Sequence, residues 1–390
     1  MKATSVVTIV PCPDYDPARV LEAVRAGLAG MDLAGLLGDA ISAGKPVLLK
    51  PNILLPALPE KGVTTHPAVF SAVARVLQEK GARLTFGDSP NGVFKFEVAA
   101  RKSGLLDAAE SLSVPAADFE SGVELHFPAG VQNKRFTVAK GALEAGAIVN
   151  LPRLKTHGLT GMTGALKNMF GVVPGSLKAE FHIRHPDAEG FSRMIADLNA
   201  AVPSRLVVMD GIMGMEGNGP GSGTLVPVGL LLFSDDPVAI DAVSCRIMGI
   251  DPMSVAVIRF AQDLGLGNAK QSAIELRGAD LEPLLPPSFK MPARSPTQGV
   301  PKWAMRLAKD LMVPKPIIDS QACIKCGDCV AACPTTPKSL RQTRGAVPVY
   351  DYSTCIRCYC CQETCRQGAI SLRGALLSRF LEGRQKARSA

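Results

Sequence analysis

The chain has 390 residues, 47% of them hydrophobic, which suggests two or three domains with sizeable cores. The formal net charge is +8, but with four Tyr and one Trp the sequence lacks the interleaved basic and aromatic residues of nucleic-acid-binding proteins, so nucleic acid is not an expected partner. No apolar run reaches the roughly 18 residues of a transmembrane helix, so no transmembrane segment is expected.

The N-terminal stretch MKATSVVTIVPCPDYD contains one Lys and a short apolar run that soon meets Asp14 and Asp16. The apolar run is too short, and acidic residues follow it too soon, for a signal peptide. Nine of the eleven cysteines crowd into one stretch near the C-terminus, which indicates a metal module in a reducing compartment and not scattered disulfides. We therefore expect a cytoplasmic protein.

Short apolar strands alternate with helices over the first part of the chain. Strands are expected at 5–10, 47–49, 83–86, 147–149, 205–209 and 228–233. A helix is expected from Pro17, because Asp16 suits the N-cap and Pro the first helical position. Further helices are expected at 67–80 and 237–248, and a hairpin at 123–127 and 134–138. Such alternation predicts an α/β fold with a largely parallel sheet and helices on both faces.

Polar residues follow nearly every expected strand. In open α/β sheets, ligands bind outside the carboxyl ends of the strands, so these residues are expected to converge on one crevice although they are far apart in sequence. The set comprises Lys50, Asn52, Asp88, Lys155, His157, Asp210 and Asp235. The alternative is that polar residues follow strands only because loops are polar.

Cationic residues concentrate between positions 153 and 182. They are Arg153, Lys155, His157, Lys167, Lys178 and His182, with Asn168 beside them. Lys and Arg bind carboxylates and phosphates well, so a small anionic ligand is expected here. A plain surface charge cluster is the alternative.

The glycine-rich stretch 213–223 is either a lid, a phosphate cradle or a set of turns. It lacks the Gly-Lys-Ser/Thr of a P-loop and leads into a strand and not a helix, so it does not meet the structural context of a dinucleotide-binding motif.

The cysteines near the C-terminus form two copies of C-x2-C-x2-C-x3-C. This is the spacing of a bacterial-type ferredoxin with two [4Fe–4S] clusters, in which the fourth cysteine of each run serves the other cluster. The first cluster is assigned to Cys323, Cys326, Cys329 and Cys365. The second cluster is assigned to Cys355, Cys358, Cys361 and Cys333.

A zinc site or a disulfide framework fits these cysteine runs less well. Zinc ribbons need two C-x2-C pairs, and a disulfide framework needs an oxidising compartment. Cys360 lies between ligands and is expected to be a bystander thiol. The first run ends in Cys-Pro, whereas the second ends in Cys365-Arg366.

The expected organisation has four parts. They are an α/β domain at 1–285, a Pro-rich linker at 286–317 with a short helix near 303–311, a small α+β two-cluster ferredoxin domain at 318–373, and a basic tail at 374–390. The tail is either a solvated, partly helical end or a docking patch for an acidic partner or a membrane surface.

Several motifs resemble one known family. They are Lys50-Pro51-Asn52, Thr64-Thr65-His66-Pro67, Gly87-Asp88-Ser89-Pro90, the run 151–157, Lys167-Asn168 with Gly171, and the run 210–220. The chain resembles the domain-of-unknown-function 362 family, and its cysteine-rich end resembles the ferredoxin tail of many members. The resemblance implies the architecture and little chemistry. Arg153 stands where that family pattern has Lys, and Arg366 where it has Pro.

The leading hypothesis is an iron–sulfur oxidoreductase that passes single electrons through two [4Fe–4S] clusters between an external donor or acceptor protein and a small anionic molecule. The candidate catalytic residues are His66, Asp88, His157, Lys167 and Glu216. The candidate substrate-binding residues are Lys50, Asn52, Arg153, Lys155, Asn168 and Asp210.

Two alternatives remain open at this point. The chain is an electron carrier or redox subunit whose α/β domain docks a partner protein, or a redox sensor. The sequence also leaves open whether the chain is an enzyme and whether the α/β domain holds a flavin or a further metal.

Overall fold

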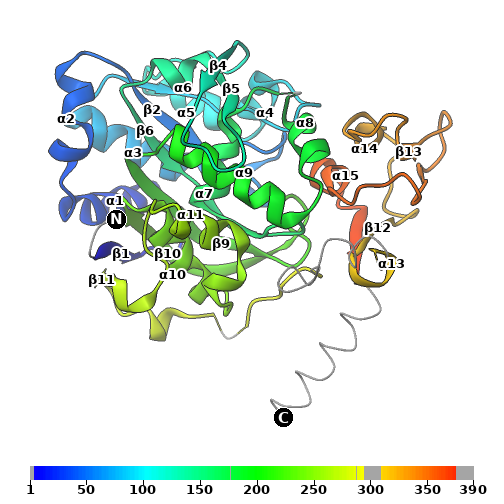
Figure 1. Ribbon diagram of the computed structural model, residues 1–390. Coiled ribbons are helices and arrows are strands. Elements are labelled where there is room, and N and C mark those ends of the chain that lie inside the picture. Colours follow the sequence, from blue (N-terminus) through cyan, green and yellow to red (C-terminus); the bar gives the residue numbers. More distant parts are fainter. Residues whose placement is uncertain (1–3, 176, 287, 294–308, 375–390) are drawn as a thin grey trace.

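The computed structural model describes residues 4–175, 177–286, 288–293 and 309–374. Figure 1 shows a large α/β body with a small module beside it. Within the described residues the body holds a nine-stranded sheet, with strand order β11-β1-β10-β9-β6-β2-β3 and with β7 and β8 branching from β9. The strands are β1 (Ser5–Pro11), β2 (Val47–Pro51), β3 (Leu84–Phe86), β6 (Ala147–Leu151), β7 (Arg153–His157), β8 (Gly161–Thr163), β9 (Leu206–Glu216), β10 (Thr224–Ser234) and β11 (Ile274–Gly278).

The sheet is mixed but largely parallel, as predicted. Strands β3, β2, β6 and β9 run parallel to one another, and β1 runs parallel to β11. Strand β10 is antiparallel to both of its neighbours, because it returns from β9 in a hairpin. The carboxyl end of β10 therefore lies beside the start of β9, where Ser234 pairs with Val207.

Helices cover both faces of the sheet, also as predicted. Successive strand residues point to opposite faces, so Leu48 joins one apolar core while Val47 and Leu49 join the other. The helices that contribute to the second core are α1 (Pro17–Ala29), α2 (Leu33–Ser42), α3 (Pro67–Glu79), α4 (Phe96–Lys102) and α5 (Leu105–Ser111). Those that contribute to the first are α6 (Lys140–Glu144), α7 (Ala165–Asn168), α8 (Leu177–Arg184), α9 (Ala188–Ala201), α10 (Pro237–Ile247) and α11 (Ala256–Asp263).

The expected strands, the hairpin of β4 (Gly122–His126) with β5 (Arg135–Ala139), and the expected helices at 67–80 and 237–248 are present. Helix α1 begins as predicted, since the carboxylate of Asp16 accepts from the backbone N–H groups of Ala18 and Arg19. One stretch differs: the residues after β6, expected as a loop, form β7, which pairs with β9 and β8. Its side chains are consequently buried.

The small module contains two short antiparallel pairs and two short helices. The pairs are β12 (Lys315–Ile318) with β15 (Ile370–Arg373), and β13 (Leu340–Arg341) with β14 (Val349–Tyr350). The helices are α14 (Asp328–Ala331) and α15 (Cys360–Thr364), and α13 (Lys309–Met312) precedes the module. This is the expected α+β arrangement, and β12 begins within the last residues of the expected linker.

Part of the expected linker, most of its helix near 303–311, and the basic tail apart from residue 374 lie outside the described residues. Within the described residues, no helix is both long enough and apolar enough to span a membrane.

Candidate functional site

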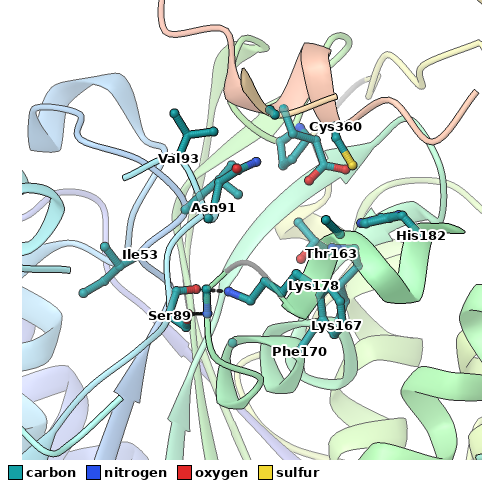
Figure 2. Close-up of a pocket in the computed structure, with 18 of the residues that line it drawn as sticks. Ile53, Ser89, Asn91, Val93, Thr163, Lys167, Phe170, Lys178, His182 and Cys360 are labelled. Atoms are coloured by element: carbon teal, nitrogen blue, oxygen red, sulfur yellow. Dashed lines mark hydrogen bonds between the residues drawn. The ribbon is translucent and has the colours of Figure 1, made fainter. Parts of the chain in front are cut away.

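A cavity of about 190 Å³ lies where the carboxyl edge of the sheet meets the small module (Figure 2). The sheet side is lined by residues that follow β2 and β3, by Lys155 and His157 of β7, and by residues of α7 and α8. The module side is lined by residues of the second cysteine run and the turn after α14. The polar or ionisable lining residues are Asn52, Asp88, Ser89, Asn91, Lys155, His157, Thr163, Lys167, Asn168, Lys178, His182, Cys333, Cys360 and Glu363.

Three lysines face this cavity, and two of them are already satisfied. Lys155 donates to the side-chain oxygen of Asn52 at 2.6 Å and to the Val63 carbonyl at 2.7 Å. Lys178, on α8, donates to the carbonyls of Ser89 and Pro90, as Figure 2 shows for Ser89. Both side chains thus help to build the wall of the cavity.

Lys167 is the third lysine and differs from the other two. Its ammonium lies 5.7 Å from the Phe170 ring centroid and 5.8 Å from that of Phe191. Among the described residues it has no hydrogen-bond acceptor and forms no close ion pair, although its charge acts on the carboxylate of Glu363. A partly exposed cation without an acceptor is suited to binding an anion.

Burial controls the charge of the two satisfied lysines. It lowers the pKa of Lys178 to about 7; the carboxylate of Asp88 opposes this effect, and the charges of Lys50 and Lys167 add to it. Burial also lowers the pKa of Lys155 well below its ordinary value. Both side chains therefore hold their protons less firmly than an exposed lysine does.

His157 and Glu363 meet across the boundary between body and module. The Nε2 atom of His157 lies 3.2 Å from Oε1 of Glu363. Burial lowers the pKa of His157 to about 4, so its ring is neutral near pH 7. Its Nδ1 accepts from the backbone N–H of Leu159 at 3.1 Å, which places the ring proton on Nε2.

The carboxyl of Glu363 is anionic in this setting. Burial by itself would raise its pKa, but His157 and Lys167 outweigh burial and lower the pKa below its ordinary value. Neither Nε2 of His157 nor Oε1 of Glu363 has a hydrogen-bond partner of good geometry among the described residues. Within the same part of the chain, the Nδ1 atom of His182 is also buried without a partner, and its ring stacks on Phe191 with centroids 4.5 Å apart.

Asp88, which lines the cavity, forms a buried ion pair with Lys50, which does not line it. Their charged atoms are 2.8 Å apart, and the second oxygen of Asp88 accepts from the Ile53 N–H. The Asn168 amide donates to Asn150 at 2.7 Å. These contacts join the ends of β2 and β3, and they join α7 to β6.

A second polar cluster takes three of the expected site residues away from the cavity. Asp210 accepts from the Tyr15 hydroxyl at 2.9 Å, from the His66 N–H at 3.0 Å and from Arg153 at 3.2 Å. The rings of Tyr15 and His66 stack at 3.7 Å. None of these four residues lines the cavity, so Arg153, Asp210 and His66 form a structural cluster in this conformation. Arg153 was expected to hold a ligand, but its charge is matched by Asp210.

Two further acidic residues also lie elsewhere. Glu216 accepts from the Lys290 N–H at 2.7 Å and does not line the cavity. Asp235 follows the antiparallel strand β10 and therefore lies at the opposite edge of the sheet. We expected the polar residues that follow the strands to converge on one crevice. That expectation is wrong for Asp235, because it assumed that all the strands run parallel.

The glycine-rich loop between β9 and β10 connects the body to the module. Gln362 donates to the backbone carbonyl of Asn218 at 2.9 Å, and Asn218 donates to the Ile370 carbonyl at 2.8 Å. Ser222 donates to the Cys365 carbonyl at 3.1 Å. The loop is a docking contact between the two parts of the chain.

The two cysteine runs have the same backbone conformation around their second cysteine. In both runs the residues on either side of the second cysteine adopt positive φ, which gives the loop a tight turn. These residues are Lys325 and Gly327 in the first run and Arg357 and Tyr359 in the second. Cys323, Cys326, Cys329 and Cys365 line one hollow. Burial and the three neighbouring thiols raise the pKa of Cys329 to about 12.

The second set is more deeply buried. Cys355, Cys358 and Cys361 are buried, and burial together with the first two of these thiols raises the pKa of Cys361. Cys333 is partly buried and packs against the apolar cluster that contains Cys361. No three His, Cys, Asp or Glu side chains of the described residues gather around one ion position, and a cubane does not require this because each thiolate binds a different iron.

Eight polar or ionisable residues of the cavity were not among the candidate catalytic or substrate-binding residues. They are Ser89, Asn91, Thr163, Lys178, His182, Cys333, Cys360 and Glu363. Lys178 and His182 belong to the cationic stretch and are four residues apart on one helix, so their spacing was a usable signal. Glu363 had no local signal, because only the docking of the module brings it to His157.

Comparison with known proteins agrees with this architecture. A family model described as domain of unknown function (DUF362) matches residues 47–246, and a 4Fe-4S dicluster domain matches residues 315–366. The thylakoid-associated protein sll1697 of Synechocystis sp. is 34% identical over 261 residues, which cover 67% of this chain and 79% of that protein.

Two solved structures are more distant. The lactate racemase apoprotein of Thermoanaerobacterium thermosaccharolyticum is 14% identical with a TM-score of 0.39, over 64% of this chain and 58% of that one. A Thermotoga maritima protein is 14% identical with a TM-score of 0.34, over 70% of this chain and 62% of that one. The chain thus spans less than two thirds of either solved protein. On its sequence matches, the chain belongs to the DUF362 family and carries a 4Fe-4S dicluster domain after the family domain.

Proposed function

We propose that this protein is an oxidoreductase in which two [4Fe–4S] clusters exchange single electrons with a small anionic molecule bound in the interdomain cavity. The observation that carries the proposal is the composition of that cavity. One wall holds the ammonium of Lys167, which lacks an acceptor among the described residues. The opposite wall holds Cys333 and Cys360, which belong to or adjoin the second cysteine set. A ligand on Lys167 would therefore lie next to the redox module.

The ligand set follows the cysteine spacing. Cys323, Cys326, Cys329 and Cys365 would hold one cluster, and Cys333, Cys355, Cys358 and Cys361 the other. When bound, such clusters accept and donate one electron at a time. The chain supplies the thiols and the anion site.

The two cysteine sets have different exposure, which supports a direction for the exchange. Cys326 is exposed, and the neighbouring Ile324 side chain is 59% exposed. Cys355, Cys358 and Cys361 are buried, and Cys333 of the same set lines the cavity. An external donor or acceptor protein would thus meet the first set, while the small molecule meets the second. Exposed Lys325 beside Cys326 favours an acidic partner.

All eleven cysteines are free of disulfides, which supports the proposal of a cytoplasmic location. In this proposal Lys155, Asn52 and Asn168 shape the cavity. His157 presents a proton at Nε2, so that a hydrogen-bond donor faces the bound molecule.

The test is an anaerobic reoxidation assay. The purified protein is expected to contain about eight irons per chain. Its reduced clusters are followed optically while carboxylates and phosphates are added in turn. One class of anion should accelerate reoxidation in the wild type, and a Lys167→Met variant with full iron content should lose that acceleration.

The matched control is Lys102→Met, because Lys102 is an exposed lysine at the end of α4. It should behave like the wild type. If Lys167→Met responds normally, the anion site is not where we place it. If no small anion acts but an acidic redox protein does, the chain is an electron carrier and the oxidoreductase proposal is wrong.

A further inference from the structure

We propose that the molecule bound in the cavity is a small hydroxycarboxylate whose carboxylate binds Lys167 and whose hydroxyl bridges His157 and Glu363. This inference deepens the proposed function and rests on it for the position of the site. It concerns binding, so it is tested without any electron transfer.

The charge of the ligand follows from the lysines. Lys155 and Lys178 have carbonyl or amide acceptors, while Lys167 has none among the described residues. One ammonium without an acceptor matches one negative charge. A phosphate carries about 1.5 to 2 negative charges, which one ammonium without an acceptor matches less well. The arrangement therefore favours a carboxylate.

The hydroxyl follows from two buried atoms of the cavity wall, Nε2 of His157 and Oε1 of Glu363, which lie 3.2 Å apart and have no hydrogen bond of good geometry within the described residues. Nε2 of His157 carries a proton and needs an acceptor, whereas Oε1 of Glu363 needs a donor. A hydroxyl group is both, since its oxygen accepts while its hydrogen is donated. An ammonium on the ligand could satisfy Glu363 but could not accept from His157. A ligand with no donor would leave an anionic carboxylate facing it, at a cost in affinity.

The size of the cavity limits the carbon skeleton. A volume of about 190 Å³ is below the roughly 300–1,000 Å³ of sites for drug-sized ligands. The ligand thus has few carbon atoms. With its carboxylate on Lys167, its hydroxyl would point to His157 and Glu363, and these two contacts fix its orientation.

The role of Glu363 makes the site dependent on the module. Glu363 belongs to α15, and its side chain is 7% exposed at the boundary with the body. Asn91 of the body donates to Thr364 of the same helix at 2.7 Å, which holds the helix against the cavity. The hydroxyl would therefore be recognised by the same module that holds the clusters.

The experiment uses two matched pairs of anions, glycolate with acetate and glycerate with propionate. Binding to the oxidised holoprotein is measured by isothermal titration calorimetry under nitrogen. Because a hydrogen bond to a charged group is at stake, the hydroxylated member of each pair should bind roughly 10- to 100-fold more tightly. In Glu363→Gln this preference should fall below about 3-fold, because the amide replaces the anionic acceptor.

Two further variants separate the contacts. Lys167→Met should weaken both members of each pair by a similar factor, because it removes the shared carboxylate contact. Glu120→Gln, an exposed glutamate remote from the cavity lining, should keep the full preference. Iron content and the cluster spectrum are checked for each variant. If Glu363→Gln loses iron, His157→Leu replaces it, with the same expected loss of preference.

Equal binding of glycolate and acetate to the wild type would overturn this inference, as would a Glu363→Gln variant that keeps the preference. Absence of binding by all four anions would overturn it as well. Failure of the proposed function looks different: the hydroxylated anions bind with the expected preference but leave the reoxidation rate unchanged.

Discussion

Replacing Asp210 by Asn tests whether the cluster around Arg153 is structural and not part of the ligand site. The side chains of Arg153 and Asp210 are 1% and 0% exposed, and their charged atoms are 3.2 Å apart. A guanidinium stays protonated at any ordinary pH, so Asp210→Asn leaves a buried cation without its counter-ion. The amide oxygen can still accept from Tyr15 or His66, so the change mainly removes charge.

The expected magnitude is large. Breaking a buried ion pair by removing one partner costs about 3–5 kcal/mol. At roughly 2–4 °C per kcal/mol for a domain of this size, the melting temperature should fall by roughly 6–20 °C. The assay is thermal unfolding of the holoprotein under nitrogen, followed by far-ultraviolet circular dichroism, with iron content measured beforehand.

Asp14→Asn is the matched control. It removes a carboxylate from an ion pair of 2.7 Å with Arg19, but both side chains are about half exposed. Solvent screens such a pair, so the melting temperature should stay close to that of the wild type. An Asp210→Asn variant that melts within about 2 °C of the wild type would refute the structural reasoning. Normal melting with a lost response to anions would return Arg153 and Asp210 to the ligand site.

Three more changes test other contacts of the site and its surroundings. Glycolate affinity should fall as the pH rises through about 7, because Lys178 then loses its positive charge. In calorimetric titrations, Lys178→Met should flatten this pH dependence. A wild-type affinity that is unchanged from pH 6 to 8.5 would contradict the prediction. Gly171→Ala should lower the melting temperature, because a Cβ there meets the Lys50–Asp88 ion pair. Gly38→Ala, in open space within α2, should instead raise the free energy of unfolding by up to about 1 kcal/mol. The reverse order of stabilities would contradict this account. Asn218→Ala should speed hydrogen exchange of the backbone amides at 360–373, measured by mass spectrometry. Exchange at the wild-type rate would show that the glycine-rich loop does not hold the module.

Much of the fold could be predicted because its signals are local. Apolar runs marked the strands, Asp16-Pro17 marked the start of α1, and Pro237 began α10. The cysteine runs were the strongest signal, since two- and three-residue spacings determine how thiols lie on one loop. These features involve residues within a few positions of each other, so a sequence displays them directly.

The partners of the polar residues were not local. Asp88 and Lys50 are separated by 38 residues, and the sequence could not show that they neutralise each other. Arg153 and Lys155 belong to the same strand, yet Arg153 joins the Asp210 cluster while Lys155 lines the cavity. The motif contained both cations but did not show that each of them has its own partner within the fold.

The sequence by itself thus determined the α/β class, the largely parallel sheet and the ferredoxin module, because periodicity and spacing express local backbone geometry. Tertiary structure decided which polar residues line the cavity. Strand β10 runs antiparallel to its neighbours, so Asp235 lies at the edge of the sheet opposite the cavity. Docking of the module brings Glu363 to within 3.2 Å of His157, although the two residues are 206 positions apart (363 minus 157). The physical reason is that pairing, burial and charge neutralisation depend on distances between segments, which a linear pattern does not contain.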